Sequence, residues 1–203
     1  EISKDVEIKK ILAIVRQFIY DNQLLIYGGT AVNNILPFKD QFYTKEDVPD
    51  YDVFSINAID DAKKMADVFF KQGYTYVETK SAVHLGTYKV YVNMIAVADI
   101  TYMDERIFKS IKKDAITLDG ILYCPPDFLR LMMYIELSRP SGDIHRWEKI
   151  YTRLLLLNKH YPIKVNIDCN TIDFQRKTFN DKDIDEFLYH VLRDTLIDDK
   201  VVF

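Results

Sequence analysis

Three aspartates in this sequence have a spacing that suits the binding of divalent cations. The stretch PDYDVFS places Asp50 and Asp52 two residues apart, and on a strand such residues point to the same face. A third acid, Asp99 in AVADIT, ends a predicted apolar strand, where a carboxylate is costly to bury without a partner. If the two strands are neighbours, the three carboxylates form a cage for two ions of the Mg²⁺ type, about 4 Å apart. Such ions stabilise the attacking and leaving oxygens of a phosphoryl displacement. The alternative interpretation is a solvated turn and a charge at a strand end.

A pair of glycines precedes these acids. In LLIYGGTAVNN, Gly28 and Gly29 separate a predicted buried strand from a short helix that Pro37 ends. Glycine at such a joint lets the backbone approach another group closely, and the free N–H groups of a helix start can bind phosphate. The backbone of Thr30 would contribute to the same site. A tight strand-to-helix turn with no ligand is the alternative.

Candidate phosphate-binding cations lie in SRPSGDIHRWEKIYTRLLLL. If Asp143 caps a helix, then Arg146, Lys149 and Arg153 occupy one helical face and an apolar stripe occupies another. A basic stripe backed by an apolar face suits a triphosphate or an RNA backbone. An ordinary solvated amphipathic helix has the same pattern.

Two further cationic residues are candidates for contact with a nucleotide. Arg139 precedes a proline in a turn and could reach inward, or it could pair with Glu136. In VHLGTYK, the side chains of His84, Thr87 and Lys89 are predicted on one strand face, from which His84 could contact phosphate. A histidine with a purely structural role fits this pattern equally well.

The elements that would position these residues follow from hydrophobic periodicity. The order is helix, strand, helix, strand, helix, several strands and then helices, which predicts a mixed α/β domain with a helical C-terminal extension. The predicted elements are a helix with an apolar stripe from Ile8 to Ile19, a strand at 24–27, a short helix at 30–36, a polar loop at 37–49, a strand at 50–56, a helix at 60–74, two or three strands in 75–103 broken near Gly86 and Asn93, and mainly helix from 104 to 160.

Composition narrows the class of protein. The chain has 203 residues, 48% of them apolar, and a net charge of -4, so any nucleic-acid contact requires a local basic patch. Cys124 and Cys169 offer neither a metal-ligand spacing nor a disulfide framework, which fits a reducing compartment. No secretory signal or membrane-spanning run is predicted, and the absence of a first Met suggests a processed chain.

The order of these motifs resembles the polymerase-beta-type nucleotidyltransferase superfamily. More closely, LLIYGGTAVNN, PDYDVFS, AVHLGTYKVYVN and VADITYM are similar to the poly(A) polymerase catalytic subunits of large cytoplasmic DNA viruses of the asfarvirus and mimivirus kind. The resemblance extends from about residue 5 to residue 165. One departure is the longer gap between Gly29 and Asp50, which falls in the polar loop, where an insertion is tolerated.

This resemblance implies an activity and a set of roles. The activity would be template-independent transfer of AMP from ATP to an RNA 3′ end, with two Mg²⁺ or Mn²⁺ ions. Asp50 and Asp52 would bind both metals, and Asp99 would bind the metal nearer the RNA 3′ end and help to deprotonate its hydroxyl. Gly28, Gly29 and the backbone of Thr30 would hold the triphosphate.

The resemblance also implies partners and a location. ATP and an RNA 3′ end would be the substrates, and no membrane partner is expected. The protein partner could be a second copy of the chain or a processivity subunit. The location would be the host cytoplasm, in the viral factory, or the virion. Two other functions stay open: a nucleotidyltransferase acting on a protein or small molecule, and a non-catalytic domain that binds RNA.

Three segments are predicted along the chain. Residues 1–135 would form the catalytic domain, 136–183 the helical extension, and 184–203 the start of a second nucleotidyltransferase-like domain. The third segment is predicted from an internal sequence similarity, because IVRQFIYDNQLLI (14–26) can be aligned with VLRDTLIDDKVVF (191–203). An unrelated helix followed by a strand is the alternative.

Overall fold

The structure, a computed structural model, describes residues 2–44, 47, 50–139 and 143–163. Contacts group residues 1–163 in one compact unit. The predicted boundary at residue 135 falls inside a helix, α5, and the predicted segment 184–203 lies outside the described residues, as do residues 140–142 and 164–183 of the predicted extension 136–183. The elements are α1 (Ile2–Asp21), β1 (Leu25–Ile26), α2 (Gly28–Ile35), the 3₁₀ helix η1 (Phe38–Asp40), β2 (Tyr51–Ser55), α3 (Ala58–Lys71), β3 (Val77–Ser81), β4 (Thr87–Val92), β5 (Ile95–Tyr102), α4 (Glu105–Lys113), β6 (Ile116–Leu118), β7 (Ile121–Tyr123), α5 (Pro126–Leu137), the 3₁₀ helix η2 (Ile144–Arg146) and α6 (Trp147–His160).

The strands of the described residues form one seven-stranded mixed sheet in the order β3-β4-β5-β2-β1-β7-β6. Strand β2 pairs in parallel with β5, and β1 pairs in parallel with β7, whereas the other neighbours are antiparallel. The prediction of a mixed α/β domain is therefore confirmed. The predicted breaks near Gly86 and Asn93 are the turns between β3, β4 and β5, and both residues have positive φ.

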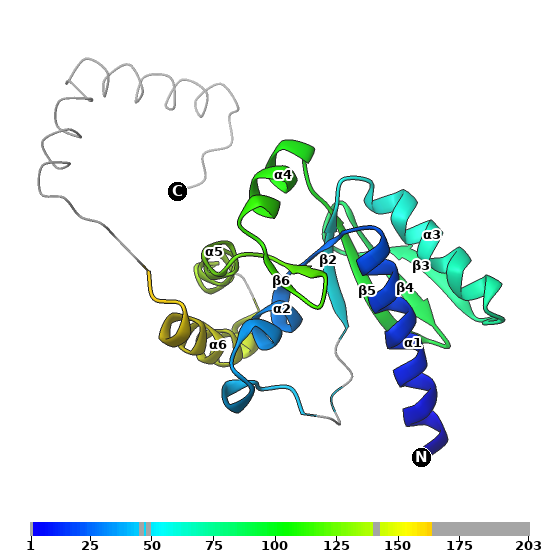
Figure 1. Cartoon of the computed structure of the whole chain (residues 1–203), viewed down its shortest axis with the longest axis horizontal. Helices are drawn as coiled ribbons and strands as arrows, with labels where there is room; N and C mark the ends of the chain where they lie inside the picture. The colour runs from blue at the N-terminus through cyan, green and yellow to red at the C-terminus, as the bar shows by residue number, and fades with distance from the viewer. Residues whose placement is uncertain (1, 45–46, 48–49, 140–142, 164–203) are drawn as a thin grey trace, which may run out of the picture. The chain divides into compact units, whose positions relative to one another are not determined.

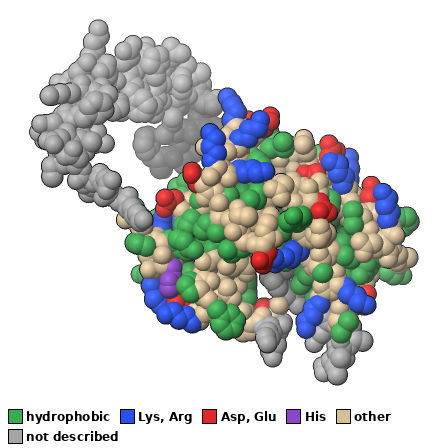
Figure 2. Space-filling view, viewed as in Figure 1, with side chains coloured by type: hydrophobic (Ala, Val, Ile, Leu, Met, Phe, Trp, Pro, Cys, Tyr) green, Lys and Arg blue, Asp and Glu red, His purple; other side chains and the backbone are tan. Residues whose placement is uncertain are grey.

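Helices cover the sheet unequally. Helices α1 and α3 contact each other, α3 packs against β2, β3, β4 and β5, and α1 packs against β5 and β7, so both lie on one side (Figure 1). Helix α2 contacts β2 and α5, and α5 packs against α6. In Figure 2, Lys and Arg side chains gather over α4, the helix that carries Arg106, Lys109, Lys112 and Lys113. No described helix is both long and apolar enough to cross a membrane.

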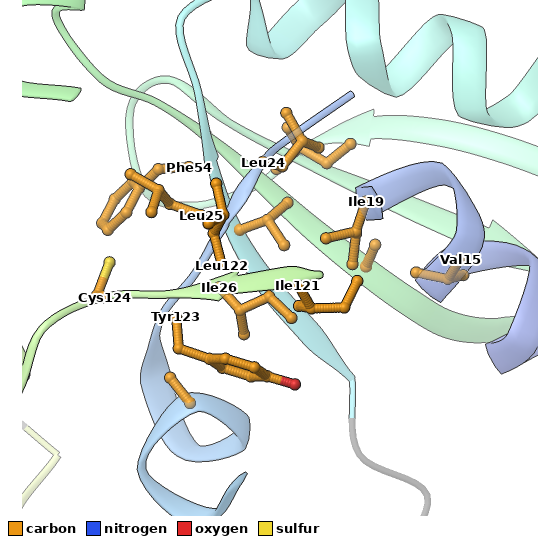
Figure 3. Close-up of a cluster of buried hydrophobic side chains, with 14 of the residues drawn as sticks. Val15, Ile19, Leu24, Leu25, Ile26, Phe54, Ile121, Leu122, Tyr123 and Cys124 are labelled. Atoms are coloured by element: carbon orange, nitrogen blue, oxygen red, sulfur yellow. The ribbon is translucent and has the colours of Figure 1, made fainter. Parts of the chain in front are cut away.

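The core centres on strand β1. Leu25 and Ile26 are fully buried between β2 and β7, and Val15 and Ile19 of α1 belong to the same buried cluster (Figure 3). Strand β1 is shorter than the predicted strand 24–27, because helix α2 starts at Gly28 and Tyr27 is its N-cap. The core therefore fixes the start of α2 against the middle of the sheet.

The prediction of a mainly helical segment from residue 104 to 160 is wrong in one part. Residues 116–123 form the hairpin β6–β7, whose two-residue turn is Asp119–Gly120. Both turn residues have positive φ, as a type I′ turn requires. Strand β7 lies beside β1, so this hairpin extends the sheet next to its most buried strand.

Candidate active site

Asp52 and Asp99 lie side by side in the sheet. Strand β2 pairs with β5 in a parallel register that sets Asp52 opposite Asp99, and paired residues in adjacent strands point to the same face. Asp50 immediately precedes β2, two residues from Asp52. Asp99 does not end its strand, as the sequence suggested, but lies within β5, which continues to Tyr102. The geometry thus brings the expected pair of acidic strands together.

Asp99 has one partner and one unsatisfied oxygen. Lys89, opposite it on β4, donates a hydrogen bond from Nζ to Asp99 Oδ2 at 2.5 Å. The other carboxylate oxygen, Oδ1, is buried and has no hydrogen-bond partner among the described residues. A buried polar atom without a partner is costly, so this oxygen is suited to receive a cation or a proton.

The pKa of the Asp52 carboxyl is raised to about 7. Burial is the largest cause, and the charges of Asp50 and Asp99 raise the pKa further, while Lys89 and Arg146 lower it. Repulsion among three neighbouring carboxyl groups is the electrostatic pattern that a divalent cation relieves. Asp50 and Asp99 are therefore close enough for their charges to act on the Asp52 carboxyl.

The donor set suits Mg²⁺ or Mn²⁺, although the carboxylates are not arranged as a finished metal site. Within the described ranges, no three His, Cys, Asp or Glu side chains are placed so that they could hold a metal ion. Lys89 already neutralises Asp99, and without a cation the like charges gain nothing by converging. The residues that would hold a cation are Asp50, Asp52 and Asp99, with Oδ1 of Asp99 available.

Each of the two glycines makes room for a side chain. Gly28 has φ +68°, and a Cβ there would overlap the Asp52 carboxyl group. A Cβ at Gly29 would overlap the Tyr43 hydroxyl and lie 2.7 Å from Arg153 Nη1. The glycines therefore admit an acid on one side and a cation on the other, which the sequence did not reveal.

Helix α2 starts without a side-chain capping hydrogen bond. Its N-cap, Tyr27, has an extended backbone, makes no side-chain capping hydrogen bond, and donates its own N–H to Asp52 O at 2.9 Å. The first N–H groups of a helix have no partner within the helix, so those of Gly28, Gly29 and Thr30 are suited to bind a phosphate oxygen. The Thr30 hydroxyl instead donates to Asp50 O at 3.0 Å, which ties the helix to the acidic strand.

Arg153 is a buried cation beside this helix start. Its guanidinium lies 4.6 Å from the centre of the Phe42 ring and donates a hydrogen bond to the Tyr43 hydroxyl at 3.3 Å. Phe42 and Tyr43 are held in turn by their N–H groups, which donate to Asn33 Oδ1. No carboxylate forms an ion pair with Arg153 within the part of the chain that the structure describes. The sequence placed it on the basic stripe without singling it out.

The other residues of the predicted stripe are dispersed. Arg146 lies in η2, is exposed and pairs with Glu136 at 3.3 Å, yet its charge still lowers the pKa of Asp52. Lys149 is exposed, and its charge lowers the pKa of Asp47. Arg139 is exposed after α5, and it is Arg146 that pairs with Glu136. Buried Arg153 and exposed Arg146 are thus the stripe members with the clearest relation to the acids and glycines.

His84 does not lie on a strand. It is exposed in the turn between β3 and β4, whereas Thr87 and Lys89 are on β4 as expected. The sequence also missed Tyr27, whose hydroxyl is linked to Thr101 Oγ1 at 2.9 Å, with Thr101 linked in turn to Thr87 Oγ1 at 2.9 Å. Burial and the charge of Asp52 raise the pKa of Tyr27. Its place directly before the glycine pair was the one available signal.

Comparison with known proteins supports this interpretation of the fold. The structure is similar to the crystal structure of the Megavirus polyadenylate synthase, with a TM-score of 0.76 and 30% identity, over 81% of this chain and 33% of that chain. A Helicobacter pylori protein, JHP933, matches with a TM-score of 0.54 and 12% identity over 78% of this chain and 67% of that chain, and shows the fold alone. The fold is thus that of a viral polyadenylate synthase, a nucleotidyltransferase.

Sequence relatives point to the same family. A protein of Acanthamoeba polyphaga mimivirus, assigned as a poly(A) polymerase catalytic subunit, is 34% identical over 78% of this chain and 27% of its own length. A protein of African swine fever virus (strain Badajoz 1971 Vero-adapted), assigned likewise, is 33% identical over 86% of this chain and 38% of its length. The family model "Poly(A) polymerase catalytic subunit" matches residues 13–143. The chain belongs to this family, and it spans between about a quarter and two fifths of the length of these relatives.

Proposed function

We propose that this chain carries the catalytic centre for template-independent transfer of AMP from ATP to an RNA 3′ end. The observation that supports this most is the pairing of Asp52 with Asp99 on adjacent strands, next to a helix start that has no side-chain cap. Carboxylates that can bind a cation, beside helix N–H groups that can bind an anion, suit a metal-bound nucleoside triphosphate. Membership of the poly(A) polymerase family supports the choice of RNA and ATP.

In this proposal the three aspartates hold two Mg²⁺ or Mn²⁺ ions. When bound, the ions supply charge stabilisation for the attacking and leaving oxygens. Asp50 and Asp52 would hold both ions, and Asp99 would hold the ion on the acceptor side through its free Oδ1 and help to deprotonate the RNA 3′ hydroxyl. The hydroxyl oxygen forms a bond to the α-phosphorus of ATP, the bond to the β-phosphate oxygen breaks, and pyrophosphate leaves.

The triphosphate is bound from the opposite side. The N–H groups of Gly28, Gly29 and Thr30 donate to its oxygens, and the buried guanidinium of Arg153 supplies positive charge next to Gly29. Arg146 and Lys149 are exposed and add longer-range attraction. His84 and Arg139, which the sequence also suggested, are exposed and contribute at most to the approach of substrate.

Transfer is tested with radiolabelled ATP, Mn²⁺ and a short oligoadenylate. We expect a ladder of extended RNA from the chain or from a longer protein that contains it. Label on protein or on a small product would instead indicate a different acceptor, and no transfer would favour a non-catalytic RNA-binding domain. A homodimer and a processivity subunit stay predictions, which the mass of the complex in solution would test. The proposed location, a viral factory or the virion, is tested by immunolabelling infected cells.

Cation binding is tested separately in the 203-residue chain itself. Mn²⁺ binding is followed by electron paramagnetic resonance in the wild type, Asp52→Ala and Asp99→Ala, with Asp60→Ala as a matched control from the exposed start of α3. We expect the first two variants to lose binding and the control to retain it. Equal binding in all four proteins would overturn the assignment of the acids.

A further inference from the structure

A row of charged side chains crosses four strands at the level of the candidate active site. In the sheet register Lys80 on β3 is opposite Lys89 on β4, Lys89 is opposite Asp99 on β5, and Asp99 is opposite Asp52 on β2. Directly opposed residues in neighbouring strands point to the same face. Two lysines therefore extend from Asp99 to the edge of the sheet, over two strand spacings or about 10 Å.

Among the described helices, α2 contacts β2, and α3 is the one that packs against β3 and β4. Val90 and Val92, which alternate with Lys89 and Tyr91 along β4, are fully buried, and α3 packs against β3, β4 and β5. Figure 1 shows α1 and α3 on the same side of these strands. The row of lysines belongs to the opposite face, where the Lys80 side chain is 63% exposed.

An aromatic ring accompanies the lysines. Tyr91 is opposite Glu78 on β3, and the Lys80 ammonium lies 5.6 Å from the centre of the Tyr91 ring. Lys80 also forms an ion pair with Glu78 at 2.5 Å. Lysines that can contact phosphates, next to a ring on which a base can stack, are the parts of a site for single-stranded nucleic acid.

We propose that the 3′-terminal nucleotides of the acceptor RNA lie across the open face of β4 and β3, with phosphates at Lys89 and Lys80 and a base on Tyr91. This inference rests on the proposed function, because Asp99 marks the position of the RNA 3′ hydroxyl. Continuity with Asp99 favours RNA over a protein partner: a strand that ends at this acid and leaves along the row passes two lysines whose present partners are the carboxylates of Asp99 and Glu78. Glu78 holds Lys80 until an RNA phosphate replaces it.

The proposal is tested by RNA binding alone, without ATP and in the presence of EDTA. The probe is a fluorescein-labelled oligoadenylate of about ten nucleotides, followed by anisotropy in the 203-residue chain. Lys80→Glu is compared with Lys63→Glu, which makes the same change of charge on the exposed surface of α3. We expect Lys80→Glu to weaken binding about fivefold more than the control. In Lys80→Ala the salt dependence should fall by about 0.7 in log–log slope.

Two further variants separate the proposed contacts from a general charge effect. Tyr91→Leu should weaken binding roughly tenfold while Tyr91→Phe, which keeps the ring, should not. Glu78→Gln should strengthen binding, because the competing carboxylate is removed. No measurable RNA binding by the wild type, or equal binding by wild type, Lys80→Glu and Tyr91→Leu, would overturn the proposal. Because metal and ATP are absent, failure of the catalytic proposal would appear in the Mn²⁺ and transfer experiments instead.

Discussion

Asp52 is the residue whose surroundings say most about the site. Its carboxyl is half-buried beside two other acids, and the charges of Lys89 and Arg146 oppose the resulting rise of its pKa to about 7. With this pKa the carboxyl is partly protonated at neutral pH. This gives no stability to the ionised form but suits a residue that exchanges a proton for a cation. Because burial raises this pKa in the folded chain, ionisation of Asp52 changes the free energy of unfolding with pH.

Replacing Asp52 by Asn should stabilise the chain above neutral pH. The folded-state pKa is raised above its ordinary value of 3.8 to about 7, so the folded protein holds a proton that the unfolded chain has released. Wild-type stability therefore falls as the pH rises from about 4 to 7 and is level above that. From pH 5 to pH 8 the advantage of Asp52→Asn should grow by about 2 to 3 kcal/mol.

Urea unfolding in EDTA at both pH values measures this difference. Asp60→Asn, from the exposed start of α3, serves as the control. An advantage of Asp52→Asn that is the same at pH 5 and pH 8 would show that the carboxyl does not have a raised pKa in the folded chain.

Arg153 is the residue to change for nucleotide binding. Its guanidinium is buried against Phe42 and Tyr43 and lies next to Gly29, so a phosphate at the start of α2 would gain a charge-assisted hydrogen bond. Loss of such a bond costs about 1.5 to 3 kcal/mol, and Arg153→Met should bind ATP at least about tenfold more weakly. Titration with a fluorescent ATP analogue in Mg²⁺ measures this, with Lys63→Met as control. ATP affinity equal to wild type in a folded Arg153→Met chain would remove Arg153 from the site.

The sequence alone predicted the three acids as a group but not their neighbours. The i, i+2 spacing of Asp50 and Asp52 survives any choice of register, so it could be interpreted directly. The pairing of Lys89 with Asp99 depends on how β4 lies against β5, and local sequence does not determine this. Whether Arg153 is buried depends on a loop residue, Tyr43, that lies 110 positions away.

At the scale of elements, the hairpin β6–β7 was missed although it has a strong local signal. ITLDGILY contains an Asp-Gly pair flanked by apolar residues, which favours a two-residue hairpin. Its strands have three residues each, and helical patterns on both sides obscure them. The parallel pairing of β7 with β1 joins segments almost a hundred residues apart, which periodicity cannot reveal.

Gly120→Ala should destabilise the chain by more than Gly73→Ala. Both glycines have positive φ, which costs an alanine about 1 to 2 kcal/mol. At Gly73 a Cβ meets open space, whereas at Gly120 it would overlap the Tyr20 ring of α1. Thermal unfolding of both variants measures the difference. In a Tyr20→Ala background the excess cost at Gly120 should disappear, and an excess that persists would place its cause elsewhere in the hairpin.

At the scale of the whole molecule, one face of the sheet forms the core and the other carries the charged side chains of the candidate site. Helices α1 and α3 bury one side of strands β3, β4 and β5, while the opposite side carries Lys80, Lys89 and Asp99 in one row. The sequence predicted a mixed α/β domain with acids on neighbouring strands, because alternation and acid spacing are local properties. The strand order, and with it the continuity of the row, is a property of the assembled sheet.

Binding of a divalent cation should stabilise the whole fold, and more so at pH 8 than at pH 6. A ligand that binds only the folded chain stabilises it by about 2.7 kcal/mol at one hundred times its dissociation constant. Below pH 7 the cation must displace the proton held by Asp52, so each lower pH unit should weaken binding by up to about tenfold. The unfolding temperature with and without Mn²⁺ at both pH values measures this effect. Stabilisation that is independent of pH, or that persists in Asp52→Asn, would place the cation elsewhere.

Lys89 sets the strength of this coupling. Its ammonium is the partner of Asp99, so a cation that uses Asp99 competes with a charge already present in the sheet. Lys89→Met removes the competitor, and it should bind Mn²⁺ more tightly while the cation-free chain becomes less stable, because Asp99 is then buried without a partner. Tighter Mn²⁺ binding and lower stability of the cation-free chain are expected in the same variant, and a general loss of structure would not tighten Mn²⁺ binding. If Mn²⁺ binds Lys89→Met more weakly than wild type, Lys89 supports the cation site through its position rather than competing for Asp99.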